Sequence, residues 1–404
     1  MPQGTERGGI AAAGEEGLAD DAVQRPLTGI TVLDFSQFLA GPSCALRLSD
    51  LGARVIKVER PDGGDASRSL YLADLAFDRD SALFHAINRG KESYTADLKD
   101  ARDIAAVKAL IRNADVLIHN FRPGIMERLG LGWADVRHLN PRLIYAGVSG
   151  YGHAGPWKDR PGQDLLVQSL SGIAWLSGDR DGPPVPAGLS ITDMMAGAHL
   201  CQGILALLVR RGVTGKGGRA DVSLLETAID LQFEHLSVHL NRAEPMPERS
   251  GISNANVYLA APYGIYETAD GYIALAMAPV DRLGELLEVP ELAAFRPDRW
   301  FEERDEIKRL IRDRLIQRGT SAWLELLEPA GIWTAPVLDW PALRAEPAFT
   351  ALQPIQSVRS PDGETLNLTR CPIRIDGEIL STGRPAPRLG AHRQSIDREQ
   401  ECAT

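Results

Sequence analysis

Two aspartates in glycine- and proline-rich surroundings are the residues best suited to carry chemistry in this chain. Asp164 follows residues 161–163 (Pro-Gly-Gln) and precedes an apolar stretch, and Asp193 opens a long helical pattern at Met194. A carboxylate at a helix start stays ionised, because the helix dipole favours negative charge there, and can act as a nucleophile or an acid–base group. The structural alternative for each aspartate is a role as helix N-cap.

Several familiar catalytic motifs do not occur in the sequence. Lys216 is followed by Gly217 in place of Ser or Thr, so the loop is not a Walker loop, and no G-x-G-x-x-G follows the first predicted strand. Residues 147–151 lack the closing glycine of a nucleophile elbow, and the eight histidines form no H-E-x-x-H pattern. These observations disfavour nucleotide triphosphatases, dehydrogenases, serine hydrolases and zinc peptidases. We predict no metal site, because the four cysteines are scattered along the chain: Cys44, Cys201, Cys371 and Cys402.

The charge of the chain argues against a nucleic acid as partner. The formal net charge is -10 and the pI is near 5.4, whereas nucleic acids need a concentrated basic face. A small anionic ligand would still need a local group of cations. Six basic residues in or near predicted loops of the first half could form one, or could be solvated surface charges: Arg60, Arg68, Arg89, Lys99, Arg122 and Arg128.

The elements that must position these residues alternate between strand and helix. Apolar, β-branched runs predict strands, and helical patterns lie between several of them. This rhythm is typical of an α/β protein with a parallel, doubly wound sheet, in which loops at the strand ends carry function. A long buried helix is predicted from Asp193 to Arg211. The predicted strands are residues 30–35, 54–59, 93–98, 116–119, 143–148 and 220–222.

The chain divides into four predicted parts. Residues 25–225 form the large domain, residues 226–340 a smaller α+β domain, and residues 341–404 a segment that returns to the large domain. Residues 1–24 lack the features of a secretory signal, so we expect a disordered tail and a cytoplasmic protein. The longest apolar runs fall short of the roughly 20 residues of a membrane helix, so no membrane association is expected.

Short motifs along the chain occur together in one order. They are residues 26–34, Ala40-Gly41-Pro42, residues 51–61, Gly64-Asp65 with Arg68, residues 120–124, Gly150-Tyr151-Gly152, Ser171-Gly172 and residues 214–217. In this order they resemble the family III CoA-transferases, which include formyl-CoA and carnitine CoA-transferases, over residues 26–392. The resemblance implies an interlocked, ring-like homodimer, each chain of which has a large Rossmann-like domain and a small domain.

The resemblance also implies an activity, the transfer of CoA from an acyl-CoA to a small carboxylic acid, with a dicarboxylic acid as one option. In such transferases an aspartate attacks the thioester and forms an acyl-aspartyl anhydride, and the released thiolate then forms an aspartyl-CoA thioester. By motif position this aspartate is Asp193. CoA and acyl-CoA are substrates, and no tightly bound cofactor is implied. The CoA contacts of the family fall on Phe38, Arg60, Lys99, Asn120, Phe121, Arg128, Leu129 and Leu224.

The acceptor pocket is expected around Leu39 and the segment that contains Asn254, Asn256 and Tyr258. Leu39 stands where formyl-CoA transferase has a glutamine before Ala-Gly-Pro, so oxalate is not the expected acceptor. The polar side chains of the later segment could orient an acid, or its asparagines could simply form turns.

Two alternatives to a transferase remain. The same family includes α-methylacyl-CoA racemases, which move an α-proton with a histidine and an aspartate. Asp164 would then be the acid–base aspartate, and His119, His138 and His153 are available as its partner. A CoA-binding protein without turnover is the second alternative, and the intact Asp193 argues against it.

Overall fold

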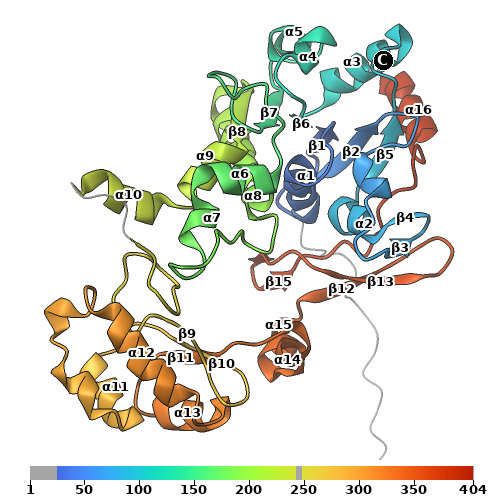
Figure 1. Cartoon of the computed structure of the whole chain (residues 1–404). Helices are drawn as coiled ribbons and strands as arrows, with labels where there is room; N and C mark the ends of the chain where they lie inside the picture. The colour runs from blue at the N-terminus through green and yellow to red at the C-terminus, as the bar shows by residue number, and fades with distance from the viewer. Residues whose placement is uncertain (1–24, 243–247, 404) are drawn as a thin grey trace, which may run out of the picture.

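The structure is a computed structural model that describes residues 25–242 and 248–403; the expected tail, residues 1–24, lies outside the described residues. Figure 1 shows a large α/β unit and a smaller unit below it, joined on one side near α10 (Phe233–Asn241) and on the other by α14 (Trp340–Ala345) and α15 (Pro347–Leu352).

The large unit is built on a six-stranded sheet in which every strand pairs with its neighbours in parallel. The spatial order is β5-β2-β1-β6-β7-β8. Counted along the chain within this sheet, the order is 3-2-1-4-5-6, which is the order of the Rossmann fold. The prediction of a parallel α/β sheet is therefore confirmed. The strands are β1 (Thr31–Asp34), β2 (Arg54–Glu59), β5 (Glu92–Thr95), β6 (Val116–His119), β7 (Ile144–Ser149) and β8 (Gly218–Ser223).

Helices cover both faces of this sheet. Successive residues of a strand point to opposite faces, so Val32 joins one buried cluster and Leu33 the other. One cluster includes α1 (Ala40–Asp50), α8 (Ile191–Thr214) and α9 (Leu224–Asp230), and the other includes α3 (Ala101–Asn113) and α5 (Trp133–Leu139). The apolar runs of the strands are explained by this burial on both faces. The remaining elements of the unit are β3 (Ala76–Phe77), β4 (Asp80–Ser81), α2 (Ala82–Asn88), α4 (Ile125–Arg128), α6 (Asp164–Ser171) and α7 (Ile173–Leu176).

The two helices α1 and α8 cross at Gly197. A β-carbon at this position would lie 2.1 Å from Ser43 Oγ and 2.7 Å from the backbone oxygen of Ala40, so only glycine permits the close approach. This crossing lies one turn after Asp193 and brings the start of α8 beside the start of α1. By length and composition α8 could cross a membrane, and one of its faces packs on α1, β7 and β8. Only about a third of its most apolar stretch is buried in this chain, so the helix is less buried than predicted.

The smaller unit has its own core, drawn from residues 261–332. An antiparallel sheet packs against three helices, in agreement with the predicted α+β domain. The core of the large unit extends past residue 225, because Ala228 of α9 packs in it. The large unit thus ends later in the chain than predicted. The elements are β9 (Gly264–Glu267), β10 (Tyr272–Leu275), β11 (Thr334–Pro336), α11 (Val280–Leu287), α12 (Arg304–Leu315) and α13 (Thr320–Leu327).

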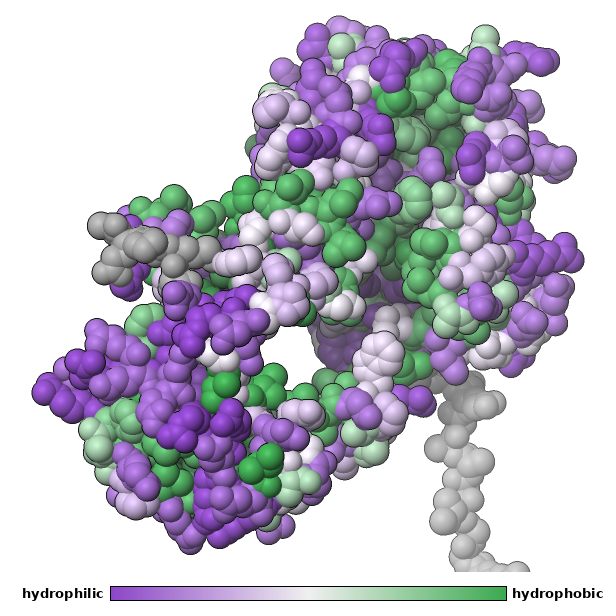
Figure 2. Space-filling model, in the orientation of Figure 1, coloured by the Kyte–Doolittle hydropathy of each residue, from purple (hydrophilic) through white to green (hydrophobic). Residues whose placement is uncertain are grey.

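The C-terminal segment lies against the large unit. Cys371 and Leu380 are buried in the same cluster as α1, and Ile396 of α16 (Arg393–Ala403) is buried beside α3. Figure 2 shows an opening through the molecule, bounded by the large unit, the small unit and the connection between them. The chain therefore has the outline of a ring. The short strands of this segment are β12 (Ile355–Arg359), β13 (Thr365–Thr369), β14 (Arg374–Ile375) and β15 (Glu378–Ile379).

Candidate active site

A large cavity of the large unit lies at the carboxyl ends of the parallel strands. Its volume is about 770 Å³, and loops after β1, β6 and β7 line it together with the first residues of α6 and α8. In the Rossmann order, strands are added outward from β1 on one side and from β6 on the other. The connections that leave these two parallel strands therefore run in opposite directions, which opens a crevice between them. The cavity occupies this crevice, where ligands of open α/β sheets usually bind.

A second cavity of about 270 Å³ adjoins the first and is lined by loops after β1, β2 and β5. Gln37, Phe121 and Ile125 line both cavities, so the two meet at these side chains. Arg60 and Lys99 lie in the second cavity and supply cations at its wall. The pair of cavities suits a long ligand that carries an anionic group at one end.

Asp193 lies in the first turn of α8 and lines the larger cavity. The N-cap of α8 is Ser190, so the reading of Asp193 as the N-cap is wrong. Burial raises the pKa of the Asp193 carboxyl to about 6, and the nearby charge of Asp164 adds to the effect. A carboxylate with this pKa is still mostly ionised at pH 7 and is more basic than an ordinary aspartate.

Asp164 is the first residue of α6 and caps α8 rather than its own helix. One carboxylate oxygen accepts hydrogen bonds from Thr192 N (2.7 Å), Thr192 Oγ1 (2.5 Å) and Asp193 N (3.2 Å). The other accepts from Gln168 Nε2 (2.5 Å). The N-cap of α6 itself is Gln163, so the N-cap reading of Asp164 is also wrong. Through these bonds Asp164 fixes the end of α8 that carries Asp193.

Seven of the eight predicted CoA contacts line the two cavities. Phe38, Asn120 and Leu224 line the larger one, Arg60, Lys99 and Leu129 line the smaller one, and Phe121 lines both. Arg128 follows the same loop but is exposed and belongs to neither wall.

The other basic residues divide between structural and cavity positions. Arg68 is buried and pairs with Glu59 (2.8 Å), and Arg89 is buried and pairs with Asp50 (3.0 Å). Arg122 lines the larger cavity. Sequence reasoning missed two further cations of that cavity, Lys158 and Arg160, although their position in a glycine- and proline-rich loop just before Asp164 was a usable signal.

The predicted acceptor pocket is only partly present in this chain. Leu39 lines the larger cavity, but Asn254, Asn256 and Tyr258 line neither cavity. The Asn254 amide donates to the backbone oxygens of Leu176 (3.1 Å) and Gly178 (2.9 Å), and Asn256 accepts from Tyr258 N (2.9 Å). Nearby backbone groups thus hold the Asn254 and Asn256 side chains, and all three residues lie outside these two cavities.

The described residues place no histidine at either cavity wall. His119 is buried, and burial lowers its pKa to about 4. His153 is exposed and pairs with Asp221 (3.1 Å), and His138 is exposed on α5. The histidine–aspartate pair that a racemase needs is thus not formed within the described part of this chain.

Comparison with known proteins agrees with this geometry. The model of CoA-transferase family III matches residues 27–393. A succinate–glutarate CoA-transferase of Agrobacterium fabrum is 31% identical and covers 93% of this chain and 96% of its own length. An acetyl-CoA:oxalate CoA-transferase of Acetobacter aceti is 35% identical and covers 93% and 95%.

Solved structures give the same result. The crystal structure of a CAIB/BAIF family protein from Brucella suis has a TM-score of 0.79, with 30% identity over 93% of this chain and 100% of that one. With a Rossmann-order sheet, two joined cavities and an aspartate at the start of α8, the chain belongs to CoA-transferase family III.

Proposed function

We propose that this enzyme moves CoA from an acyl-CoA to a small carboxylic acid, with Asp193 as the covalent nucleophile. The observation that carries the proposal is the position of Asp193, whose half-buried carboxylate lines the larger cavity beside Asp164 while no described histidine does. A carboxylate alone can exchange acyl groups, whereas α-proton transfer needs a second acid–base group opposite it.

Each step conserves the activated acyl bond. A carboxylate oxygen of Asp193 attacks the thioester carbonyl, the C–S bond breaks, and an acyl-aspartyl anhydride and CoA thiolate result. The thiolate attacks the aspartyl carbonyl of the anhydride, which releases the donor acid and forms an aspartyl-CoA thioester. The acceptor carboxylate attacks this thioester, the C–S bond breaks, and a second anhydride and the CoA thiolate result. The thiolate attacks the acceptor carbonyl of this anhydride, which forms acceptor-CoA and releases the Asp193 carboxylate.

The two cavities suggest how CoA is oriented. Arg60 and Lys99 would meet its phosphates in the smaller cavity, and Phe121 at the junction would pack against its apolar part. The thioester end then reaches the larger cavity, where Asp193 lies. Asn120 and Phe38 border this path.

We propose a dicarboxylic acid as the acceptor. Arg122, Lys158 and Arg160 line the cavity that contains Asp193, so an acid held there by one carboxylate has cations for the other. Relatives of this chain are named for succinate, glutarate and mesaconate. The shared chemistry is a short acid with a second carboxylate.

We also propose a homodimer of interlocked rings. The opening in Figure 2 supports it, and so do large apolar side chains exposed on this chain, among them Leu189 (70% exposed), Phe233 (69%) and Leu240 (72%). Asn256 and Tyr258 line neither of the two cavities of their own chain, and in an interlocked dimer they could reach the larger cavity of the partner chain. Light scattering should give twice the 43.9 kDa of the chain; a mass of 43.9 kDa would contradict the dimer.

The test of function is a transfer assay beside an exchange assay. Succinyl-CoA is offered with acetate, oxalate, glutarate and mesaconate, and 2-methylacyl-CoA is incubated in deuterium oxide. We expect transfer to glutarate and mesaconate but not to acetate or oxalate, no deuterium uptake, and loss of transfer in Asp193→Asn. Asp159→Asn, an exposed aspartate outside both cavities, is the matched control and should keep its activity. Deuterium uptake without transfer would make the enzyme a racemase. The absence of both reactions would indicate a CoA-binding protein without turnover.

A further inference from the structure

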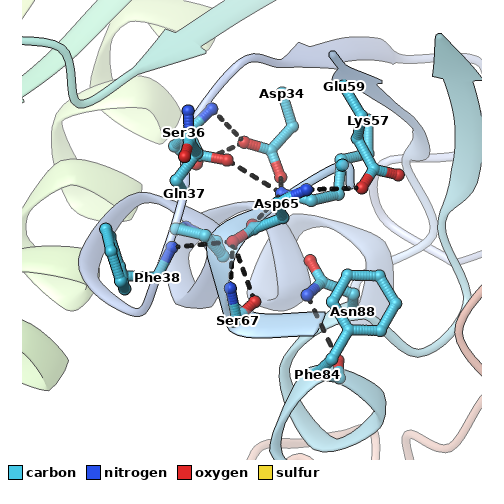
Figure 3. A network of polar contacts seen from close by, with 12 residues as sticks. Asp34, Ser36, Gln37, Phe38, Lys57, Glu59, Asp65, Ser67, Phe84 and Asn88 are labelled. Atoms are coloured by element: carbon cyan, nitrogen blue, oxygen red, sulfur yellow. Dashed lines mark hydrogen bonds and ion pairs between the residues drawn. The ribbon is translucent and has the colours of Figure 1, made fainter. Parts of the chain in front are cut away.

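The loop at residues 36–38, which follows β1, is held by side chains rather than by secondary structure (Figure 3). Asp34 accepts from Ser36 N (3.0 Å), and Lys57 donates to the backbone oxygen of Ser36 (2.8 Å). Asn120 binds both the N–H (2.9 Å) and the carbonyl (2.7 Å) of Gln37. Each of these backbone groups is therefore assigned to one fixed partner.

Phe38 is the member of the loop that most needs such support. Its φ is +64°, a left-handed conformation that residues with a β-carbon rarely adopt and that persists only when the surroundings impose it. Its side chain is 50% exposed and lines the larger cavity. The remaining loop N–H, that of Phe38, donates to Asp65 Oδ1 (3.2 Å).

Asp65 is buried and divides its two oxygens between two tasks. Oδ1 accepts from Phe38 N and also from Ser67 N (2.8 Å) and Ser67 Oγ (2.9 Å), whereas Oδ2 pairs with Lys57 Nζ (2.7 Å). Lys57 in turn holds the Ser36 carbonyl. Both ends of the carboxylate thus lead to the backbone of the loop, one directly and one through Lys57.

The surrounding charges keep Asp65 in this place. The side chains of Lys57, Asp34 and Lys91 are fully buried with it, and Lys91 pairs with Asp34 (2.8 Å). Two carboxylates and two ammonium groups therefore balance one another in a buried site, where an ion pair is stabilising only if its geometry is good. A carboxylate needed only as a counterion for Lys57 would not also have to reach the N–H of Phe38.

We propose that Asp65 is a positioning residue for CoA transfer that acts through Phe38. It holds the Phe38 backbone in its left-handed conformation, and so sets the wall against which the thioester lies as it faces Asp193. The inference rests on the proposed function, since it takes the reacting thioester to lie in the larger cavity. Small displacements of a reacting group are enough to lower a rate by about 100-fold.

The first comparison separates positioning from folding. Asp65→Ala removes the acceptor of the Phe38 N–H, and kcat for transfer should fall about 10- to 100-fold, with a smaller change in the dissociation constant of free CoA. Asp65→Asn keeps an oxygen for the three Oδ1 donors but sets an amide nitrogen against Lys57, so it should recover part of the kcat that Asp65→Ala loses. Asn88→Ala truncates another buried member of the network, one that contacts Lys91 and Phe84 but not the loop, and should leave kcat within about twofold.

A double-mutant cycle then tests whether Asp65 acts through Phe38. Glycine adopts positive φ freely, so in a Phe38→Gly background Asp65→Ala should lower kcat much less than in the wild type. If Asp65→Ala does not fold, Asp65→Glu replaces it, because it keeps the charge for Lys57 but displaces the acceptor.

The outcomes are distinct. If the wild type transfers CoA, two results would overturn this inference alone. One is an Asp65→Ala effect on kcat that is fully retained in the Phe38→Gly background, and the other is an Asp65→Asn variant as impaired as Asp65→Ala. A wild type without any transfer activity overturns the proposed function, and this inference falls with it.

Discussion

Replacing Asp164 by asparagine should shift the pH dependence of the enzyme to lower pH. The amide oxygen can still accept hydrogen bonds from the first N–H groups of α8, so the helix end should stay in place. The negative charge beside Asp193 is lost, however. Because that charge is one of the two causes that raise the Asp193 pKa to about 6, the pKa in the variant should fall between 3.8 and about 6.

The size of the effect follows from the ionised fraction of Asp193. With a pKa of about 6, half of the carboxyl is ionised at pH 6, and about a tenth at pH 5. Burial is the larger cause of the raised pKa and remains in the variant, so the shift is partial. At pH 5 the Asp164→Asn enzyme should keep more than a tenth of its own maximal rate. Its rate at pH 8 should be lower than that of the wild type, because a less basic carboxylate is a weaker nucleophile.

The assay should use no acceptor acid, because the titration of its carboxyl groups would also change the rate with pH. Exchange of labelled CoA into the donor acyl-CoA needs Asp193 but no acceptor, and both enzymes share any titration of the CoA phosphate. An acidic limb that stays at the same pH in Asp164→Asn, or that moves to higher pH, would falsify the electrostatic role given to Asp164.

Three further predictions follow from the same geometry. Folding raises the Asp193 pKa from 3.8 to about 6, so the protonated carboxyl favours the folded state, and this contribution to the free energy of unfolding is present below pH 3.8 and lost as pH rises through about 6. Asp193→Asn should therefore melt at or above the wild-type temperature at pH 7.5, and this difference in melting temperature should vanish near pH 3.8. Gly197→Ala should cost about 1–3 kcal/mol in denaturant unfolding, because its β-carbon meets α1, whereas Gly212→Ala in open space on the same helix should not destabilise. Arg60→Ala and Lys99→Ala should each weaken CoA binding about tenfold in calorimetry while leaving pantetheine thioesters unaffected, and equal losses for both ligands would contradict the phosphate assignment.

The sequence predicted the fold because local patterns specify it. Strands buried on both faces must be apolar, and alternation with helices leaves few topologies besides a parallel sheet. Asp193 was also predictable, because its motif position and helix start lie within a few residues of each other. In the structure Asp193 lines the larger cavity.

The remaining site features depend on contacts between distant parts of the chain. Asp164 could be interpreted as a cap of its own helix, but the backbone N–H groups that it binds lie 28 and 29 residues away on α8. Asp65 and Lys57 entered the sequence analysis only as members of motifs, although a lysine within the apolar run of β2 already required a buried counterion. Asn254 shows the converse, since its residue type suited a ligand but nearby carbonyl groups occupy its amide.

The central claim is that Asp193 becomes acylated, and chemical trapping tests it most directly. The enzyme is incubated with succinyl-CoA, treated with hydroxylamine, which converts an anhydride or thioester of an aspartate into a hydroxamate, and mapped by peptide mass spectrometry. We expect the hydroxamate on Asp193, none in Asp193→Asn, and continued labelling of Asp193 in Asp164→Asn. Turnover without any trapped aspartate, or a label on Asp164 in place of Asp193, would contradict the account.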